Sequence, residues 1–597
     1  MYSIVFLQSM RHSSIPSAQL VVQHCKAKRI KNIIISPGSR NAPLTIDFTE
    51  DPYFSCFSIV DERSAAFFAL GIAQHLREPA AVVCTSGSAL LNYYPAVAEA
   101  FYSGIPLVVI SADRPVYKID VGDGQTIRQD NVFHRHIGYS AHMQQDISHA
   151  RESVAKYAPK WIEGDLEDNL QKKIQQHNDS ELNMALNVAL KLKLPVHINV
   201  PFEEPLYDTA LKPAAVPLVV PAEEKEESEI PEIRTYTELW NASSRKMVLV
   251  GVNPPNSVEQ QFLNYLAYDS SVIVFTETTS NLHNSHFFSS IDSILAPIEK
   301  RKNREELFEK LRPEILLTFG GLVVSKKIKA FLREYKPRHH WHIDSLKAYD
   351  TFFSLNHHFK MGANGFFQQF MPHVQLAKSD YFTYWDSIRT AYKLKRREYI
   401  DSIPFSDMYV FERAAAAIPE NYQLHLANSS TVRYAQLVDL KTSLKVFCNR
   451  GTSGIDGSTS TAVGSSMYAD GPTLLISGDL SFFYDSNGLW NNYVRPDFRI
   501  ILINNNGGGI FRILPGREDT ENFQRFFETA HQLDAEHLSK QFGFDYLSVE
   551  NKNELNTALS DFYSVSDSPK LLEIHTPRVL NDKILLGYFD FISSVYK

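Results

Sequence analysis

The sequence predicts an α/β fold made of three doubly wound domains, each built on a parallel sheet. Two observations predict it. Short apolar runs rich in β-branched residues alternate with helix-length segments, which is the pattern of parallel sheets covered by helices. This alternation occurs in three stretches separated by polar junctions, and a chain of 597 residues suits three or four domains of about 150 residues each.

The first stretch, residues 10–215, has the pattern of a doubly wound domain. Buried strands are expected at Asn32–Ser36, Phe57–Val60, Ala80–Cys84, Leu107–Ser111 and Pro195–Val200, with helices at Ser64–Gln74 and Ala89–Tyr102. The Pro- and Glu-rich segment Val216–Pro231 then predicts an exposed linker.

The second stretch, residues 232–378, repeats the layout with strands at Met247–Gly251, Val272–Phe275, Ile315–Phe319 and His340–Ile343, and helices at Ser257–Tyr268 and Val324–Tyr335. A polar, aromatic-rich segment, Leu376–Trp385, predicts the next junction. The third stretch, residues 382–597, contains two apolar strands, Pro472–Ser477 and Phe498–Ile503, on either side of an expected helix at Phe483–Tyr493.

The bulk composition excludes several classes of function. A net charge of −8 gives no global reason to bind nucleic acid, and 44% hydrophobic content is that of an ordinary globular protein. No apolar run reaches the ~20 residues that span a bilayer. The four cysteines are widely spaced without a C-x-x-C pair, and the first residues lack the basic region of a signal peptide. We therefore expect a cytoplasmic protein with reduced thiols.

The most informative motif pairs Gly478-Asp479-Leu480-Ser481 with Asn504-Asn505-Asn506-Gly507-Gly508. The two segments follow the two strands of a predicted βαβ crossover, which places the carboxyl ends of both strands at one edge of the sheet. A carboxylate and a side-chain amide then converge beside glycines that allow close backbone approach. Such oxygen ligands suit Mg²⁺, which keeps its other positions for phosphate and water. The pair predicts a metal-bridged diphosphate site.

Each half of this motif has a structural alternative. Aspartate at a strand end is often only a helix N-cap, and Asn-Gly runs form turns. The histidine pairs His134/His136 and His339/His340 lack ligand partners at metal-site spacing, so packing roles are favoured for them. The chain contains no G-x-G-x-x-G and no G-x-x-x-x-G-K-[ST] motif, which argues against dinucleotide and P-loop sites.

Taken together, the motifs resemble those of thiamine diphosphate (ThDP)-dependent enzymes of the decarboxylase/ligase type. Within that superfamily the chain is similar to the 2-succinyl-5-enolpyruvyl-6-hydroxy-3-cyclohexene-1-carboxylate (SEPHCHC) synthase family of menaquinone biosynthesis. The segments that carry the resemblance are Ser36–Arg40, Asp61–Ser64, Thr85–Ser88, Ala112–Pro115, Arg450–Gly457 and Asn504–Phe511. The resemblance covers essentially the whole chain. It implies a pyrimidine-binding domain at 10–215, a central domain at 232–378 and a diphosphate/Mg-binding domain at 382–597.

The resemblance also implies which residues hold the cofactor. Asp479, Asn505 and the carbonyl of Gly507 match the ligands of Mg²⁺ (or Mn²⁺), and Glu62 matches the glutamate that bonds the aminopyrimidine ring. Beside the apolar Phe67 and Phe68, a buried carboxyl at Glu62 would suit proton sharing with a ring nitrogen. Ile455 matches the bulky side chain that bends the cofactor, although an isoleucine packed in the core is equally compatible with the sequence. The other implied cofactor contacts are Ser86, Gly87, Gly454, Asp456, Gly478, Leu480, Ser481, Ile510 and Phe511.

The family decarboxylates 2-oxoglutarate and joins the remaining unit to isochorismate, so the site needs fixed cations. Arginine suits carboxylates because its planar fork binds them bidentately. The resemblance implies Ser429, Arg433 and Arg450 for the 2-oxoglutarate-derived part. It implies Ser39, Arg40, Arg114, Gln125, Lys326 and Lys327 for isochorismate, with Glu62, Arg40, Arg114 and Gln125 as catalytic residues. For any isolated arginine, the alternative is a surface ion pair.

Two further expectations come from the resemblance. Glu62 and Asp479 belong to different domains, which in this superfamily come from different subunits, so a homodimer or a higher assembly such as a tetramer is implied. Two other functions stay open on the sequence alone. The chain could be another ThDP-dependent lyase or ligase that uses pyruvate, like acetolactate synthase, or a catalytically silent metabolite-binding protein of the same fold.

Overall fold

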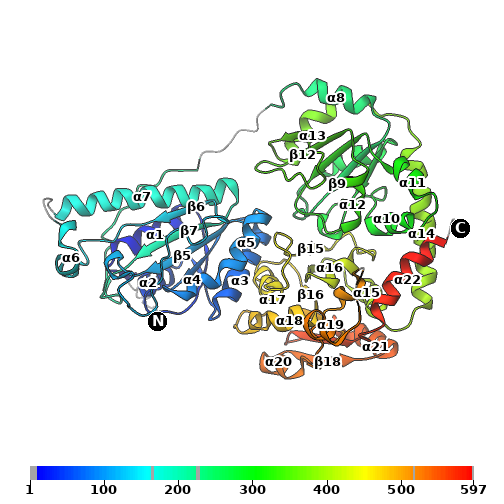
Figure 1. Ribbon diagram of the computed structural model, residues 1–597. Helices are drawn as coiled ribbons and strands as arrows, with labels where there is room; N and C mark the ends of the chain where they lie inside the picture. The colour runs from blue at the N-terminus through cyan, green and yellow to red at the C-terminus, as the bar shows by residue number, and fades with distance from the viewer. Residues whose placement is uncertain (1–9, 163–166, 223–228, 515, 517, 595–597) are drawn as a thin grey trace, which may run out of the picture. The chain divides into compact units, whose positions relative to one another are not determined.

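The computed structural model describes residues 10–162, 167–222, 229–514, 516 and 518–594. Its first sheet is six-stranded and wholly parallel, which confirms the predicted fold class (Figure 1). In spatial order its strands are β3 (Ser55–Ser58), β2 (Asn32–Ile35), β4 (Ala80–Cys84), β5 (Leu107–Asp113), β7 (Val196–Pro201) and β6 (Tyr139–His142). A short antiparallel pair, β1 (His12–Ser13) with β8 (Thr209–Ala210), joins the two ends of this region.

Two further parallel sheets follow along the chain. The five-stranded sheet has the order β10 (Val272–Phe275), β9 (Lys246–Val250), β11 (Ile315–Phe319), β12 (His339–Ile343) and β13 (His357–Phe359). The six-stranded sheet near the C-terminus has the order β15 (Lys445–Phe447), β14 (Gln423–Leu426), β16 (Thr473–Gly478), β17 (Arg499–Asn504), β19 (Lys570–His575) and β18 (Asp545–Val549). Each sheet lies within one of the three predicted stretches, although the stretch boundaries themselves remain predictions.

Helices connect the strands in all three regions. In the first region they are α1 (Pro16–Ala27), α2 (Ala42–Glu50), α3 (Glu62–Leu76), α4 (Ser88–Asn92), α5 (Tyr94–Ser103), α6 (Arg151–Tyr157) and α7 (Glu167–Leu192). In the second they are α8 (Ile233–Ala242), α9 (Gln260–Tyr268), α10 (Ile291–Glu299), α11 (Arg304–Leu311), α12 (Lys326–Glu334) and α13 (Ala363–Phe370). The third region contains α14 (Tyr381–Ser402), α15 (Asp407–Ala417), α16 (Ser430–Ala435), α17 (Ser458–Ser466), α18 (Asp479–Tyr484), α19 (Glu521–Phe526), α20 (Glu536–Gln541), α21 (Lys552–Phe562) and α22 (Asn581–Ser593).

The central strands are buried on both faces because helices cover both sides of each sheet. In the first sheet, Ile33, Val83 and Ile110 pack in one cluster with α1 and α7, while α3 contacts β2 and β4. Burial on both faces explains why these strands read as continuous apolar runs without alternation.

The strand order places two switch points where ligands bind in folds of this kind. In the first sheet the chain leaves β2 toward β3 and then returns to β4, so the loops after β2 and β4 diverge at their carboxyl ends. In the C-terminal sheet the same reversal occurs between β14 and β16. The motif segments Ser36–Arg40 and Thr85–Ser88 follow β2 and β4, and Asp479 follows β16 directly. The topology therefore puts the predicted site residues at crevice positions.

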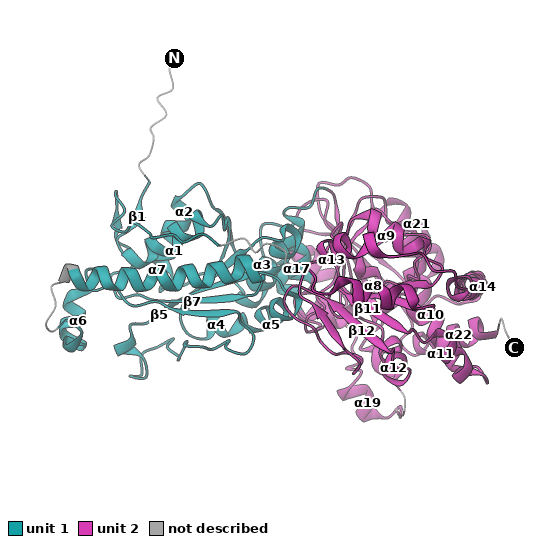
Figure 2. Cartoon of the chain, turned by 90° about the horizontal axis from the view of Figure 1, so that it is seen from above, with its two compact units in different colours: residues 1–224, 459–470, 485–494 teal, residues 225–458, 471–484, 495–597 magenta. Residues whose placement is uncertain are grey.

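The chain divides into two compact units, coloured separately in Figure 2. Unit 1 comprises residues 1–224, 459–470 and 485–494, and unit 2 comprises residues 225–458, 471–484 and 495–597. Two short pieces of the third predicted stretch thus belong to the unit that contains the first sheet. Within unit 1, Ser58 N–H donates to the Tyr493 hydroxyl at 2.8 Å, and Asn487 Nδ2 donates to Asp61 Oδ2 at 2.8 Å.

Two glycines allow α3 and α17 to cross closely inside unit 1. A Cβ on Gly71 would lie 2.1 Å from the carbonyl oxygen of Thr461, and one on Gly464 would lie 2.0 Å from that of Phe68. Both obstacles are backbone atoms, which cannot move aside as a flexible side chain can. The crossing carries the helix that begins at Glu62, so its geometry helps to position that carboxylate.

We predict that Gly464→Ala destabilises unit 1 by about 1–3 kcal/mol, the usual cost of overpacking. Gly124→Ala is the matched control, because a Cβ there meets nothing within 4 Å. The measurement is the urea midpoint of the two variants. Equal midpoints for both variants and the wild type would show that the two helices have room for the added methyl group.

Two local expectations differ from the structure. The helix expected at Phe483–Tyr493 instead begins at Asp479 and ends at Tyr484, followed by the 3-10 turn Ser486–Leu489. It stops because the Asp485 carboxylate turns away to accept the backbone N–H and hydroxyl of Ser460, both at 2.8 Å.

The first part of the predicted linker is exposed, with Val216 at 78%. It is nevertheless held along α7, because the Asn183 side chain hydrogen-bonds the backbone of Leu218 and Val220. Residues 223–228 of that linker lie outside the described residues.

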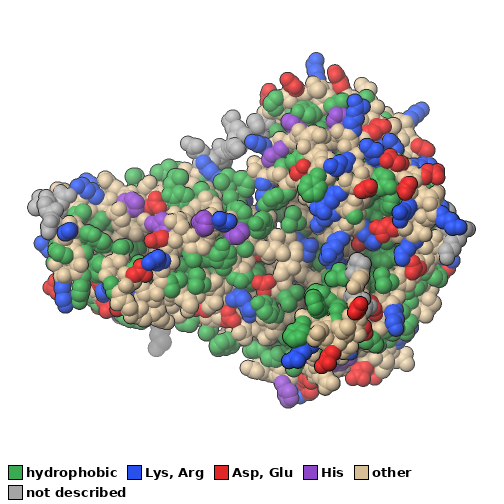
Figure 3. All heavy atoms as spheres, viewed as in Figure 1, with side chains coloured by type: hydrophobic (Ala, Val, Ile, Leu, Met, Phe, Trp, Pro, Cys, Tyr) green, Lys and Arg blue, Asp and Glu red, His purple; other side chains and the backbone are tan. Residues whose placement is uncertain are grey.

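The surface agrees with the composition. On the face shown in Figure 3, basic and acidic side chains are interspersed. Among the described residues, no helix has the length and apolar character that a membrane crossing requires.

Candidate functional site

Asp479 and Gly507 lie in contact at the edge of the C-terminal sheet, as the motif predicts. Asp479 is the first residue of α18 and is 3% exposed. Its Oδ1 accepts the N–H of Leu480 at 2.7 Å, and its Oδ2 accepts the N–H of Gly507 at 2.9 Å. His531 Nε2 lies 3.3 Å from the same Oδ2. The βαβ crossover therefore brings the two halves of the motif together.

The three consecutive asparagines have distinct surroundings. The Asn504 side chain is hydrogen-bonded within the protein at both ends. Its amide nitrogen donates to the Leu533 carbonyl and the Glu573 carboxylate, and its oxygen accepts the Asn506 N–H. Asn505 Nδ2 donates to Asp407 Oδ2 at 3.0 Å, and its amide oxygen accepts no hydrogen bond from the residues that the structure describes. Asn505 is thus the asparagine whose oxygen is available to a cation.

Asp407, which sequence reasoning missed, orients that amide. Besides Asn505 it accepts the hydroxyl of Thr576 at 2.5 Å, and burial raises the pKa of its carboxyl to about 6. Asp407 lies far from the motif in sequence and has no pattern around it. Only the folded packing of α15 could reveal its role.

The oxygen set at this edge fits a magnesium ion. It consists of a buried carboxylate, an amide oxygen and the nearby backbone carbonyl of Gly507, all hard donors. Within residues 10–594, apart from the few that the structure leaves undescribed, no group of three or more His, Cys, Asp or Glu side chains is placed to hold a metal. A cation here would therefore depend on phosphate and water for its remaining ligands.

The turn at Gly454-Ile455-Asp456 is fixed beside the start of α18. The carbonyl of Gly454 accepts Asn428 Nδ2, and that of Ile455 accepts Ser481 Oγ, both at 2.7 Å. The Ile455 side chain is nevertheless 37% exposed, which leaves an apolar surface facing outward from a rigid turn. Gly478 closes β16, and Ile510 and Phe511 lie half-buried in the 3-10 turn Gly509–Ile513.

In unit 1, the loop after β4 is bound to the loop that carries Gln125. Ser86 Oγ donates to the Gln125 carbonyl at 2.9 Å. Gly87 has a φ of 89°, and a Cβ on it would lie 3.0 Å from that same carbonyl. The N–H of Gly87 donates to Gln129 Oε1 at 2.9 Å. Gln129, a buried residue with no motif around it, is a second positioning residue that the sequence did not indicate.

Arg40 and Arg114 lie within electrostatic reach of each other. Arg40 is 3% exposed and donates to the Phe202 carbonyl and to Glu204 Oε1, both at 3.0 Å. Burial lowers its pKa, and the Arg114 cation lowers it further. Arg114 donates to the Gly124 carbonyl at 2.9 Å. Both side chains keep a buried Nε without a partner among the described atoms, while Ser39 and Gln125 are exposed beside them.

Glu62 occupies the first turn of α3, with Asp61 as the N-cap that accepts the N–H groups of Arg63 and Ser64. The sequence suggests burial of the Glu62 carboxyl against Phe67 and Phe68. The two phenylalanine rings are buried in the core, but Glu62 itself is half-buried. Asn92 Nδ2 donates to Glu62 Oε2 at 3.3 Å. The carboxylate thus remains reachable by a ligand.

The predicted 2-oxoglutarate residues gather in unit 2. Ser429 has a φ of 68° and begins the turn into α16, which carries Arg433. Arg450 is 9% exposed and donates to Asn428 Oδ1 at 2.7 Å. Lys326 and Lys327 do not share one direction: Lys326 is exposed, and Lys327 pairs with Glu299 at 2.5 Å.

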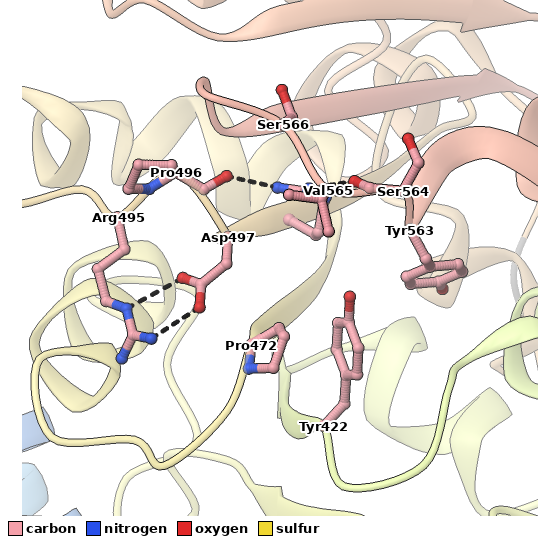
Figure 4. A pocket seen from close by; sticks show the side chains of 10 residues that line it. Tyr422, Pro472, Arg495, Pro496, Asp497, Tyr563, Ser564, Val565 and Ser566 are labelled. Atoms are coloured by element: carbon pink, nitrogen blue, oxygen red, sulfur yellow. Dashed lines mark hydrogen bonds and ion pairs between the residues drawn. The ribbon is translucent and has the colours of Figure 1, made fainter.

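A pocket of about 310 Å³ lies elsewhere, at the amino-terminal edge of the C-terminal sheet (Figure 4). Arg495 and Asp497 form an ion pair beside it with N–O distances of 3.0 and 2.7 Å. Arg499 donates to the carbonyls of Phe562 and Ser564. Because its charged groups are committed to one another or to backbone, and it lies at the edge opposite Asp479, this pocket is not the predicted site.

Two family models and several known proteins match this chain. Residues 16–145 match the family described as thiamine pyrophosphate enzyme, N-terminal TPP binding domain, and residues 428–574 match the corresponding C-terminal TPP binding domain. The chain is 56% identical to the SEPHCHC synthase of Christiangramia forsetii, over 98% of this chain and 100% of that protein. It is 51% identical to that of Flavobacterium johnsoniae over 97% and 99%, and 38% identical to that of Porphyromonas gingivalis over 95% of each.

Proposed function

Because the chain belongs to the SEPHCHC synthase family and is a ThDP-dependent transferase of menaquinone biosynthesis, we propose that it decarboxylates 2-oxoglutarate and adds the remaining four-carbon unit to isochorismate. The observation that carries the proposal is the contact of Asp479 with Gly507 at the edge where Asp479 and Asn505 follow the paired strands β16 and β17, next to the turn of Ile455. When bound, ThDP supplies the electron sink that this decarboxylation needs.

In this proposal the C-terminal sheet holds the diphosphate end of the cofactor. Asp479, Asn505 and the Gly507 carbonyl would bind Mg²⁺ or Mn²⁺. Gly454, Asp456, Gly478, Leu480 and Ser481 would line the phosphates, with Ile455, Ile510 and Phe511 as the apolar wall. The support is the rigidity of this edge, where Asp407 orients the Asn505 amide and Ser481 fixes the Ile455 carbonyl.

Unit 1 would supply the proton-handling group and the isochorismate cations. The Glu62 carboxyl would hold a proton in a hydrogen bond to a cofactor ring nitrogen, and Ser86 and Gly87 would shape the loop beside it. Arg40, Arg114, Ser39 and Gln125 would bind and orient isochorismate. The nearby Arg40 and Arg114 guanidiniums support this, because a carboxylate between them would offset their mutual repulsion.

Unit 2 would bind the carboxylate of 2-oxoglutarate that is not lost, through Ser429, Arg433 and Arg450. Lys326 and Lys327 are proposed for isochorismate, and the exposed ammonium of Lys326 is the more accessible of the two. We also propose a homodimer or a larger assembly and a cytoplasmic location, following the family's arrangement of paired sites.

A substrate assay tests the proposed function. With ThDP and Mg²⁺ present, we expect product and CO₂ from 2-oxoglutarate plus isochorismate. Pyruvate should be a poor donor because it lacks the second carboxylate that Arg433 and Arg450 would bind. The measurement compares CO₂ release and isochorismate consumption with each donor. Equal or faster turnover of pyruvate would favour an acetolactate-synthase-like activity, and no turnover of either would favour a silent binding protein.

A further inference from the structure

A lysine outside the predicted set lies within electrostatic reach of the predicted 2-oxoglutarate cations, Arg433 and Arg450. Lys329 is on α12, one turn after the N-cap Ser325, and is half-buried. Lys329 and the two arginines all belong to unit 2. A substrate-binding role for this lysine rests on the proposed function, because it concerns which side chains of unit 2 bind 2-oxoglutarate.

Hydrogen bonds connect the start of α12 to the segments that carry the two arginines. The Glu277 carboxylate accepts the N–H groups of Val324 and Ser325 at 2.8–2.9 Å. Its neighbour Thr278 donates its N–H to Gln436 at 2.9 Å and accepts from the Gln436 amide at 2.6 Å. Gln436 lies at the end of α16, one turn after Arg433.

A second link reaches the strand before Arg450. Asn281 Nδ2 donates to the Val446 carbonyl, and the Val446 N–H donates to Asn281 Oδ1, both at 2.8 Å. Val446 lies in β15, four positions before Arg450. The segment 277–281 thus joins α12 to α16, which carries Arg433, and to β15, which precedes Arg450 (Figure 1).

The three cations have few partners. Arg433 and Arg450 each have a buried Nε without a hydrogen-bond partner. In the part of the chain that the structure describes, the Arg450 side chain donates to Asn428, and neither Arg433 nor Lys329 forms an ion pair. The carboxylates of Asp292 and Glu277 act on Arg433 electrostatically, without a direct ion pair. Burying cations without directly bonded counter-charges is costly, so this arrangement favours an anionic occupant.

The electrostatics agree with that geometry. Burial lowers the pKa of Lys329, and the guanidiniums of Arg450 and Arg433 lower it further, against the attraction of Glu277. Burial also lowers the pKa of Arg433, with the Arg450 cation as the next cause. Glu277 compensates only in part, because burial raises its own pKa to about 7. The three cations thus lie within electrostatic reach of one another, opposed by the carboxylates of Glu277 and Asp292.

We propose that Lys329 binds the retained carboxylate of 2-oxoglutarate together with Arg433 and Arg450, so that the central region contributes a third substrate cation. Lys327 cannot fill this place because it pairs with Glu299. Glu277 acts as a positioning residue, since it joins the start of α12 to the segment that contacts α16 and β15.

The test compares Lys329→Met, Lys329→Arg and the control Lys336→Met, which removes an exposed lysine just beyond α12. For Lys329→Met we expect the KM for 2-oxoglutarate to rise roughly 10-fold or more, as removal of a charge-assisted bond implies. The KM for isochorismate should change by less than about twofold. Lys329→Arg should recover most of the loss, and Lys336→Met should match the wild type.

A binding assay separates the role of Lys329 from the proposed function. Glutarate is an unreactive dicarboxylate, and it should raise the melting temperature of the wild-type holoenzyme but give a clearly smaller rise for Lys329→Met at the same concentration. A wild type that makes no product would overturn the proposed function, and the glutarate shift would still decide on Lys329. If Lys329→Met keeps both the 2-oxoglutarate KM and the glutarate shift while its melting temperature falls, Lys329 is only a structural partner of Glu277 and the inference is wrong.

Discussion

Glu62→Gln is expected to lower turnover by about 10²–10⁴-fold, the usual contribution of a positioned acid–base group. Glutamine keeps the size of the side chain and can still contact Asn92, but it cannot hold or release a proton at the cofactor ring. The helix should remain intact because its N-cap is Asp61. The measurement is steady-state turnover with 2-oxoglutarate and isochorismate.

Cofactor binding provides the control for this variant. Glu62→Gln should still show a melting-temperature rise with ThDP and Mg²⁺, because the proposed diphosphate contacts come from the C-terminal sheet. Glu50→Gln, at the exposed end of α2, should behave like the wild type. Turnover of Glu62→Gln within about threefold of the wild type would rule out the assigned role.

Asp479→Asn should weaken metal-dependent cofactor binding by roughly 100-fold or more, since even outer-shell partners of metal ligands contribute about 10–100-fold. The native carboxylate accepts two N–H groups, from Leu480 and Gly507, and an amide offers only one acceptor oxygen. The substitution therefore removes the negative charge and disrupts one of these bonds. The measurement is the ThDP concentration dependence of the melting temperature at fixed Mg²⁺.

Asp497→Asn is a matched control for this second variant. Asp497 lies at the amino-terminal edge of the same sheet, paired with Arg495 (Figure 4). Its loss should leave the cofactor dependence unchanged. Equal cofactor affinity in Asp479→Asn and Asp497→Asn would place the diphosphate somewhere else.

The strands could be predicted from sequence because two-sided burial demands continuous apolar runs. Asn32–Ile35 and Ala80–Cys84 form strands where those runs occur. The end of α18 could not be predicted in this way, because it is set by the contact of Asp485 with Ser460. These two residues are far apart in the sequence, and no sequence pattern links them. Helix periodicity gives no information about such tertiary hydrogen bonds.

The same distinction applies to the site. Residues inside motifs, such as Asp479 and Asn505, could be predicted as candidates because one crossover places them at the same sheet edge. Asp407 and Gln129 could not, since each acts through a partner far away in the sequence. Lys329 is a third case. Helix geometry shows that the side chains of neighbouring lysines point in different directions. Only the packing of α12 decides which lysine lies within electrostatic reach of Arg433 and Arg450.

The edge formed by Asp479, Asn505 and Gly507 is proposed to hold ThDP through a divalent cation. The most direct measurement is the thermal melting of the wild-type protein with ThDP, with Mg²⁺, with both, and with both plus a chelator. We predict a clear rise only when both are present, corresponding to about 2.7 kcal/mol at roughly 100 times the dissociation constant. An unchanged melting temperature with both ligands at saturating concentrations would contradict the account.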